Sequence, residues 1–151
     1  MNAITKNIPN SITCLNLLSG CFACLFAYKG EYDIVALCIG LSALFDFLDG
    51  MAARLLHAYS PMGKELDSLA DLISLGLAPG FMAMHFMLYD SVFHGINDSY
   101  QIWWALSALL IPVFSALRLA KFNIDTRQTT SFIGLPVPAN ALFWIGICQA
   151  G

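Results

Sequence analysis

The chain has 151 residues, of which 58% are hydrophobic and only 11% are charged, and its mean hydropathy is +0.70. A soluble domain carries roughly 25% charged residues, so this composition indicates a membrane protein. The net charge of −3 argues against nucleic-acid binding, because proteins that bind nucleic acids present a basic face.

Apolar runs follow one another along most of the chain. A membrane-spanning helix needs about 20 mostly apolar residues, and four runs approach that length, at 12–28, 34–56, 65–88 and 102–121. A fifth run begins near Ala139 and is too short to span before Gly151. We expect an all-α polytopic membrane helix bundle of about five helices. We also expect the chain to be a truncated or partly ordered version of a longer one.

Two local sequence features add detail to the expected helix bundle. The first dozen residues are polar, with Ile4, Ile8 and Ile12 at helical spacing, which predicts a short N-terminal interfacial segment before the first span. Pro79-Gly80 predicts a kink near the middle of the third helix. Residues 1–151 are expected to form a single membrane domain, incomplete at its C-terminus.

The basic residues are distributed unevenly over the expected loops. If the N-terminus is cytoplasmic, only Lys29 falls outside. The basic residues on the cytoplasmic side are then Lys6, Arg54, Lys64, Arg118, Lys121 and Arg127. Short cytoplasmic loops are enriched in Lys and Arg, so we expect the N-terminus on that side.

Four aspartates lie towards the cytoplasmic ends of the second and third predicted helices. Asp46 and Asp49 are three residues apart, and Asp67 and Asp71 are four apart, so each pair shares a helix face. A short loop joins the two helices, which are therefore expected to be antiparallel neighbours with the carboxylates between them. Acidic residues inside membrane helices are costly and usually functional. The alternative is that these aspartates are loop-end residues solvated at the interface.

Bound cations would offset the repulsion among four carboxylates. Hard oxygen ligands select Mg²⁺, Mn²⁺ or Ca²⁺, and a paired-metal site suits phosphoryl transfer. Gly50 and Ala53 lie on the same stripe as the first two aspartates and leave a groove for a ligand. Arg54 at the edge of that stripe is placed to clamp a diphosphate.

The fixed residues from 46 to 71 have the spacing D-x-x-D-G-x-x-A-R, eight residues, then G-x-x-x-D-x-x-x-D. They are Asp46, Asp49, Gly50, Ala53, Arg54, Gly63, Asp67 and Asp71. This pattern resembles the signature of the CDP-alcohol phosphotransferase family. Residues 8–13 look like the start of the family's first membrane helix, and residues 118–123 and 132–138 look like its phosphatidylserine synthase branch.

The resemblance implies a bundle of six membrane helices, usually dimeric, with an active site open to the cytoplasm; this chain departs from it by stopping in the fifth helix. It implies transfer of a substituted phosphate from a CDP-linked donor to an alcohol, with release of CMP. In the phosphatidylserine synthase branch the donor is CDP-diacylglycerol and the acceptor is L-serine. The expected setting is the lipid bilayer of a bacterial inner membrane, and the expected assembly is a homodimer.

Family roles carry over to the matching positions. Asp46, Asp49 and Asp67 are expected to hold two divalent metal ions, Mg or Mn. Asp71 is expected to contribute to the second ion and to act as the general base. The residues expected to bind CDP-diacylglycerol are Asn10, Thr13, Gly50, Ala53, Arg54, Gly63 and Lys64. Helix capping is the simpler explanation for Asn10 and Thr13, and Lys64 could be a membrane anchor.

The serine carboxylate needs a cationic partner, and the candidates are Arg118, Lys121 and Asn123. The alternative for the two cations is that they anchor the helix at the membrane surface. Another acceptor alcohol, such as glycerol 3-phosphate or inositol, is the nearest rival function. A cation transporter using intramembrane acids is the rival from another class, but these acids cluster at one membrane face rather than along a path. A structural subunit with metal-stabilised helices is the third possibility.

Overall fold

All elements of the described chain are helical. The computed structural model describes residues 3–89, 98–124 and 137–150; Arg127 and most of the 132–138 segment lie outside these ranges. The α-helices are α1 (Ala3–Lys29), α2 (Tyr32–Leu55), α3 (Pro61–Asp71), α4 (Ala78–Tyr89), α5 (Asp98–Ser107), α6 (Leu110–Ile124) and α7 (Val137–Ala150). A π-helical segment, η1 (Leu72–Leu77), joins α3 to α4.

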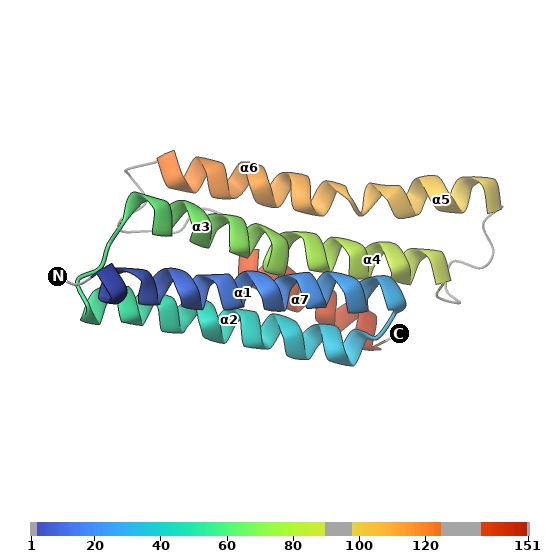
Figure 1. Ribbon diagram of the computed structural model, residues 1–151. Coiled ribbons are helices and arrows are strands. Elements are labelled where there is room, and N and C mark those ends of the chain that lie inside the picture. The colour runs from blue at the N-terminus through green and yellow to red at the C-terminus, as the bar shows by residue number, and fades with distance from the viewer. Residues whose placement is uncertain (1–2, 90–97, 125–136, 151) are drawn as a thin grey trace.

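Four stretches are long and apolar enough to cross a membrane. They are Asn7–Lys29, Tyr32–Leu55, Pro61–Tyr89 and Tyr100–Ile124, and α7 is a shorter apolar helix. Successive spans run in opposite directions, so the end of the bundle that holds the start of α1 also holds the end of α2 and the start of α3 (Figure 1). The predicted all-α polytopic bundle is therefore confirmed, with four candidate spans and one short helix among the described residues.

The N-terminal segment belongs to the first helix. Helix α1 is continuous from Ala3 to Lys29, with Pro9 inside it, and its candidate membrane span begins at Asn7. The interfacial position of the segment before the span stays a prediction. Asn10 and Thr13 consequently lie inside α1 and not at its start. The helix-capping explanation for these two residues is therefore wrong.

The third span is irregular one turn before the predicted kink. The backbone N–H of Ala78 bonds the Ile73 carbonyl, five residues back, which is the π-helical pattern, and Pro79 follows at once. Proline has no N–H to donate, and its ring crowds the preceding turn, so a change of helical register just before it is expected. The fourth span is also interrupted, between α5 and α6 and ahead of Pro112, but by a tighter turn: the N–H groups of Ala108 and Leu109 bond carbonyls three residues back.

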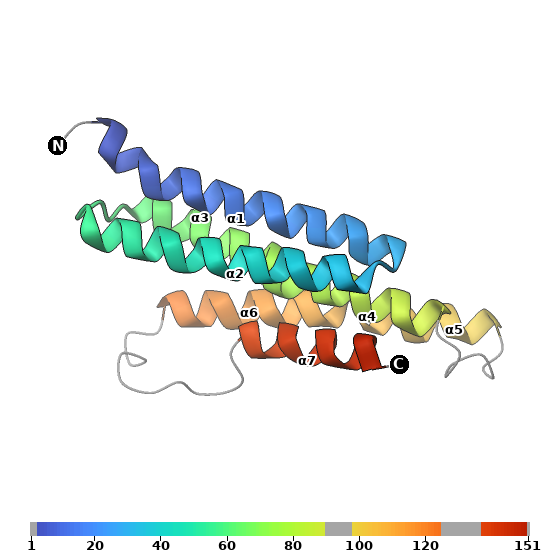
Figure 2. The same cartoon turned by 90° about the horizontal axis from the view of Figure 1, so that it is seen from below.

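Small residues allow these irregular helices to pack closely. A methyl group on Gly20 of α1 would lie 2.9 Å from the Ser74 Cβ in η1, and one on Gly76 would lie 3.1 Å from the Ser115 Cβ in α6. Helix α7 lies on the far side of the bundle from α1 (Figure 2) and contributes Val137 to the buried core. The segment from α3 to α4 is therefore the central element, and it carries two of the aspartates into the interior.

Candidate active site

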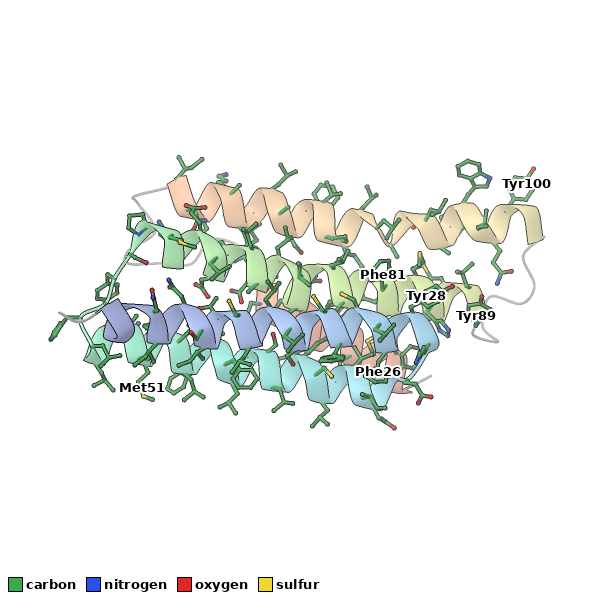
Figure 3. The ribbon with its side chains drawn as sticks, in the orientation of Figure 1. Phe26, Tyr28, Met51, Phe81, Tyr89 and Tyr100 are labelled. Carbon is green, nitrogen blue, oxygen red and sulfur yellow. The ribbon has the colours of Figure 1, made fainter. Side chains whose placement is uncertain are left out.

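The structure brings together three of the four aspartates at the α1 start of the bundle. One carboxylate oxygen each from Asp46, Asp49 and Asp67 lie within 4.8 Å of one another. Asp49 is buried, and the other two are half-buried. The opposite face of α2 is apolar: Met51, two residues after Asp49, points outward from the bundle (Figure 3).

The turn between α2 and α3 aligns the two acid-bearing helices. Ser60 caps α3 by accepting a 3.0 Å hydrogen bond from the Gly63 N–H, and Pro61 occupies the first turn, where its missing N–H costs nothing. Gly63 also faces α1, because a methyl group on it would lie 2.9 Å from the Asn10 Oδ1. Glycine at this position therefore lets α1 and α3 approach beside the acids.

Helix α1 supplies hydrogen-bond donors to two aspartates on the other helices. The Thr13 hydroxyl donates to the Asp49 Oδ2 at 2.5 Å, and the Asn16 Nδ2 donates to the Asp71 Oδ1 at 3.4 Å. The Thr13 hydroxyl also lies 3.0 Å from the Pro9 carbonyl, but its single hydrogen serves one acceptor at a time. Thr13 thus contacts an acidic side chain directly, besides lining the cavity described below.

One carboxylate oxygen lacks a donor. Among the described residues, the Asp67 Oδ1 is buried and has no hydrogen-bond partner. A buried anionic oxygen without a partner is costly, and two further carboxylates lie beside it. Clustered carboxylate oxygens are the ligands that Mg²⁺ and Mn²⁺ prefer, so this group of residues fits a divalent cation.

A cavity of about 520 Å³ adjoins the acids, within the usual range for small-molecule sites. It is bounded by α1, the end of α2, the 56–60 turn and the start of α3. All seven residues expected to bind the donor line it: Asn10, Thr13, Gly50, Ala53, Arg54, Gly63 and Lys64. Asp49 and Asp67 line it as well, whereas Asp46 and Asp71 do not.

The three residues expected to bind serine do not gather at this cavity. Arg118 lines a separate cavity of about 370 Å³ between α6 and α7, and Lys121 is exposed. Asn123 connects α6 to α3 instead, because its Nδ2 donates to the Ser68 hydroxyl at 2.9 Å. Its backbone carbonyl also accepts a 3.5 Å hydrogen bond from the Lys64 Nζ.

Sequence reasoning assigned no role to Asn16 or Ser42. Both side chains are fully buried, and the Ser42 hydroxyl donates to the Asn16 Oδ1. The available signal was a polar side chain inside an apolar run, since such groups need partners within a membrane. No spacing rule relates residues on different helices that are 26 positions apart.

Comparison with known proteins adds the family. The model of the CDP-alcohol phosphatidyltransferase family matches residues 6–149, nearly the whole chain and all of the site. The chain belongs to this family. Three curated relatives of this family member are each named CDP-diacylglycerol–serine O-phosphatidyltransferase. The relative from Bacillus subtilis is 40% identical over 131 residues, the one from Helicobacter pylori 36% over 136, and the one from Methanocaldococcus jannaschii 35% over 142.

The aligned regions cover most of this chain but a smaller share of each relative. They take in 87%, 89% and 94% of this chain, in the same order, but only 69%, 54% and 60% of the relatives' own lengths. No solved structure gave a significant match. The family membership therefore rests on sequence, and the geometry of the site rests on the helices described above.

Proposed function

We propose that this protein is a phosphatidylserine synthase, which transfers the phosphatidyl group of CDP-diacylglycerol to L-serine and releases CMP. The observation that carries the proposal is the cavity beside the three clustered aspartates, with Arg54 and Lys64 on its wall. Cations next to a cluster of metal-binding acids suit a diphosphate. The names of the three relatives favour serine as the acceptor.

In this proposal Asp46, Asp49 and Asp67 hold two divalent ions, Mg or Mn, and Asp71 contributes to the second. The unpartnered Asp67 Oδ1 supports the assignment. Such ions neutralise negative charge at the diphosphate and on the departing CMP. Thr13 holds one oxygen of Asp49, so it orients that carboxylate as well as bounding the donor cavity.

Substrate binding and proton transfer are assigned to side chains of the protein. Arg54 and Lys64 bind the diphosphate, and Asn10 bonds the cytidine end. Gly50 and Ala53 line the α2 side of the cavity, and the small size of these residues leaves room there for the nucleotide. Asp71 accepts the proton of the serine hydroxyl as general base. The serine oxygen then forms a bond to the phosphorus that carries diacylglycerol, the bond from that phosphorus to CMP breaks, and CMP leaves with the electron pair.

Serine binding is assigned to the end of α6. Arg118 and Lys121 supply positive charge there for the serine carboxylate. Asn123 bonds Ser68, three residues before Asp71, so the end of α6 lies beside the helix that carries the base. We further propose that the N-terminus and the cavity face the cytoplasm of a bacterial inner membrane, and that the enzyme is a homodimer, as the family resemblance implies.

The test is CMP release from CDP-diacylglycerol by the purified protein with Mg²⁺ or Mn²⁺. Serine, glycerol 3-phosphate and inositol are offered separately. Release with serine alone, abolished by a chelator and restored by added metal, is the expected result. Release with a different alcohol would keep the family chemistry and overturn the acceptor. No release with any alcohol, from folded protein in lipid, would overturn the function.

The base assignment has its own test in Asp71→Asn. This variant keeps the size of the side chain but cannot accept the proton, so CMP release should fall roughly 10²–10⁴-fold. Binding of CDP-diacylglycerol, measured directly in detergent, should change little because Asp71 does not line the donor cavity. Turnover like that of the wild type would rule out Asp71 as the base.

A further inference from the structure

Two buried polar side chains connect the three helices that form the site. Asn16 on α1 and Ser42 on α2 are both 0% exposed. Polar groups inside a membrane protein are costly unless they are paired, and these two pair with each other. Asn16 continues the connection to Asp71 on α3. The chain of contacts therefore ends at the proposed base.

The donors and acceptors in this connection have one consistent direction. The Ser42 Oγ lies against two oxygens of Asn16, the backbone carbonyl at 3.2 Å and the Oδ1. Neither oxygen carries a hydrogen, so the hydroxyl is the donor. With its Oδ1 held by Ser42, the Asn16 amide presents its Nδ2 to the Asp71 Oδ1. Rotating the amide by half a turn would set two acceptor oxygens against each other.

We propose that Ser42 and Asn16 are positioning residues that orient the Asp71 carboxylate. Asn16 holds one lone pair of the Oδ1, whose second lone pair remains for the second ion, and this leaves the Oδ2 to accept the proton of the attacking hydroxyl. Ser42 acts one step further away, by fixing which end of the Asn16 amide faces Asp71. This inference rests on the proposed function, in which Asp71 is the base.

Helix α1 offers a matched control one turn deeper. Ser19 is also buried and also joins α1 to α2, because its hydroxyl donates to the Cys38 carbonyl at 2.8 Å. This hydrogen bond goes to a backbone carbonyl and not to an aspartate. Ser19→Ala therefore removes the same kind of buried interhelical hydrogen bond as Ser42→Ala, without touching the connection to Asp71.

The experiment compares Ser42→Ala, Asn16→Ala and Ser19→Ala in the full chain. Partners that orient metal-binding side chains typically contribute 10–100-fold to metal affinity or activity, and we expect an effect of the same size on the base, so the first two variants should lower kcat roughly 10–100-fold. The KM for CDP-diacylglycerol and the affinity for Mn²⁺, measured by electron paramagnetic resonance without substrate, should stay near the wild-type values. Ser19→Ala should keep a kcat close to that of the wild type. An equal loss in Ser42→Ala and Ser19→Ala, or a loss of Mn²⁺ affinity that matches the loss of kcat, would overturn the proposal.

A double-mutant cycle distinguishes positioning from packing. In an Asp71→Asn background, Asn16→Ala should cost no further activity, because it acts through Asp71. A full additional loss in that background would overturn the positioning role. The experiment distinguishes failure of this inference from failure of the proposed function. If the proposed function is wrong, the wild type releases no CMP with any acceptor. If only the positioning role is wrong, the wild type remains active. If Asn16→Ala does not fold, Ser42→Ala with Asp71→Asn provides the same cycle.

Discussion

The two glycines of α2, Gly40 and Gly50, have different surroundings. Gly50 lines the cavity beside the acids, and Gly40 is exposed ten residues earlier. A methyl group on either would meet nothing within 4 Å. Neither glycine is therefore required by packing, and any effect of a substitution at Gly50 must come from what occupies the cavity.

This difference gives a prediction at the scale of one methyl group. Gly50→Ala should raise the KM for CDP-diacylglycerol about 10-fold or more, since a methyl group in a fitted pocket is worth that much discrimination. Gly40→Ala should leave KM unchanged, and neither variant should lower the midpoint of thermal unfolding. Equal KM values for the two variants would show that the donor does not approach Gly50.

The sequence predicts the residues of this site better than their pairing. Helical spacing was sufficient to place Asp46 with Asp49 and to direct both towards the next helix, because three-residue separations share a face. The hydrogen bond from Thr13 to Asp49 and the one from Asn16 to Asp71 depend on the rotation and depth of α1 against α2 and α3. Those quantities are set by packing along the whole helices and leave no local pattern in the sequence.

At the scale of the helices, the two interrupted spans meet near their interruptions. Gly80, just after η1, faces the turn that precedes α6. A methyl group on Gly80 would lie 2.9 Å from the Pro112 Cδ and 3.6 Å from the Ala108 carbonyl oxygen. The proline ring is rigid and the carbonyl belongs to the backbone, so neither can move aside easily.

Gly80→Ala should therefore destabilise the bundle. Overpacking of a tight contact costs about 1–3 kcal/mol, which exceeds the gain of up to about 1 kcal/mol that alanine brings inside a helix. Gly146→Ala on α7 is the control, because a methyl group there meets nothing within 4 Å. Unfolding in mixed micelles with increasing sodium dodecyl sulfate measures both variants. A Gly80→Ala protein as stable as the control would mean that the two spans separate without cost.

Hydropathy predicted the spans and missed their irregularities for a physical reason. The length of an apolar run reports the thickness of the bilayer, so the four predicted runs lie close to the observed spans. Hydropathy depends on the amino-acid composition alone, so it does not distinguish a π-helical segment from an α-helix of the same sequence. Pro79 indicated a disturbance, but the register change falls in the turn before it, where the lost hydrogen bond has to be replaced.

At the scale of the whole molecule, the two ends of the bundle differ in character. The cavity and Arg54 and Lys64 lie at the end where α1 starts, whereas Tyr28 and Tyr89 lie at the other end (Figure 3). Tyrosines are enriched at both membrane interfaces, and Tyr59 lines the cavity, so the tyrosines do not distinguish the two sides. Basic residues favour the cytoplasmic side, so Arg54 and Lys64 support the proposed cytoplasmic cavity.

The orientation can be tested with single cysteines in the two short turns. Glu31 and Tyr59 are both exposed, and they lie at opposite ends of α2. In intact cells a membrane-impermeant maleimide should label Glu31→Cys at once, and Tyr59→Cys only after permeabilisation. The wild type, with its own five cysteines, gives the background labelling. The reverse pattern would place the cavity on the outer side.

The position of the site within the chain has a consequence for biosynthesis. The four aspartates, their partners on α1 and the whole lining of the larger cavity lie within the first 71 residues, on helices joined by two short turns. Chains fold from the N-terminus as they are made, and these three helices are synthesised before α5, α6 and α7. The costliest groups in the membrane are therefore synthesised together with the donors that satisfy them, and all residues of the proposed ion site are present while the second half of the chain is still being translated.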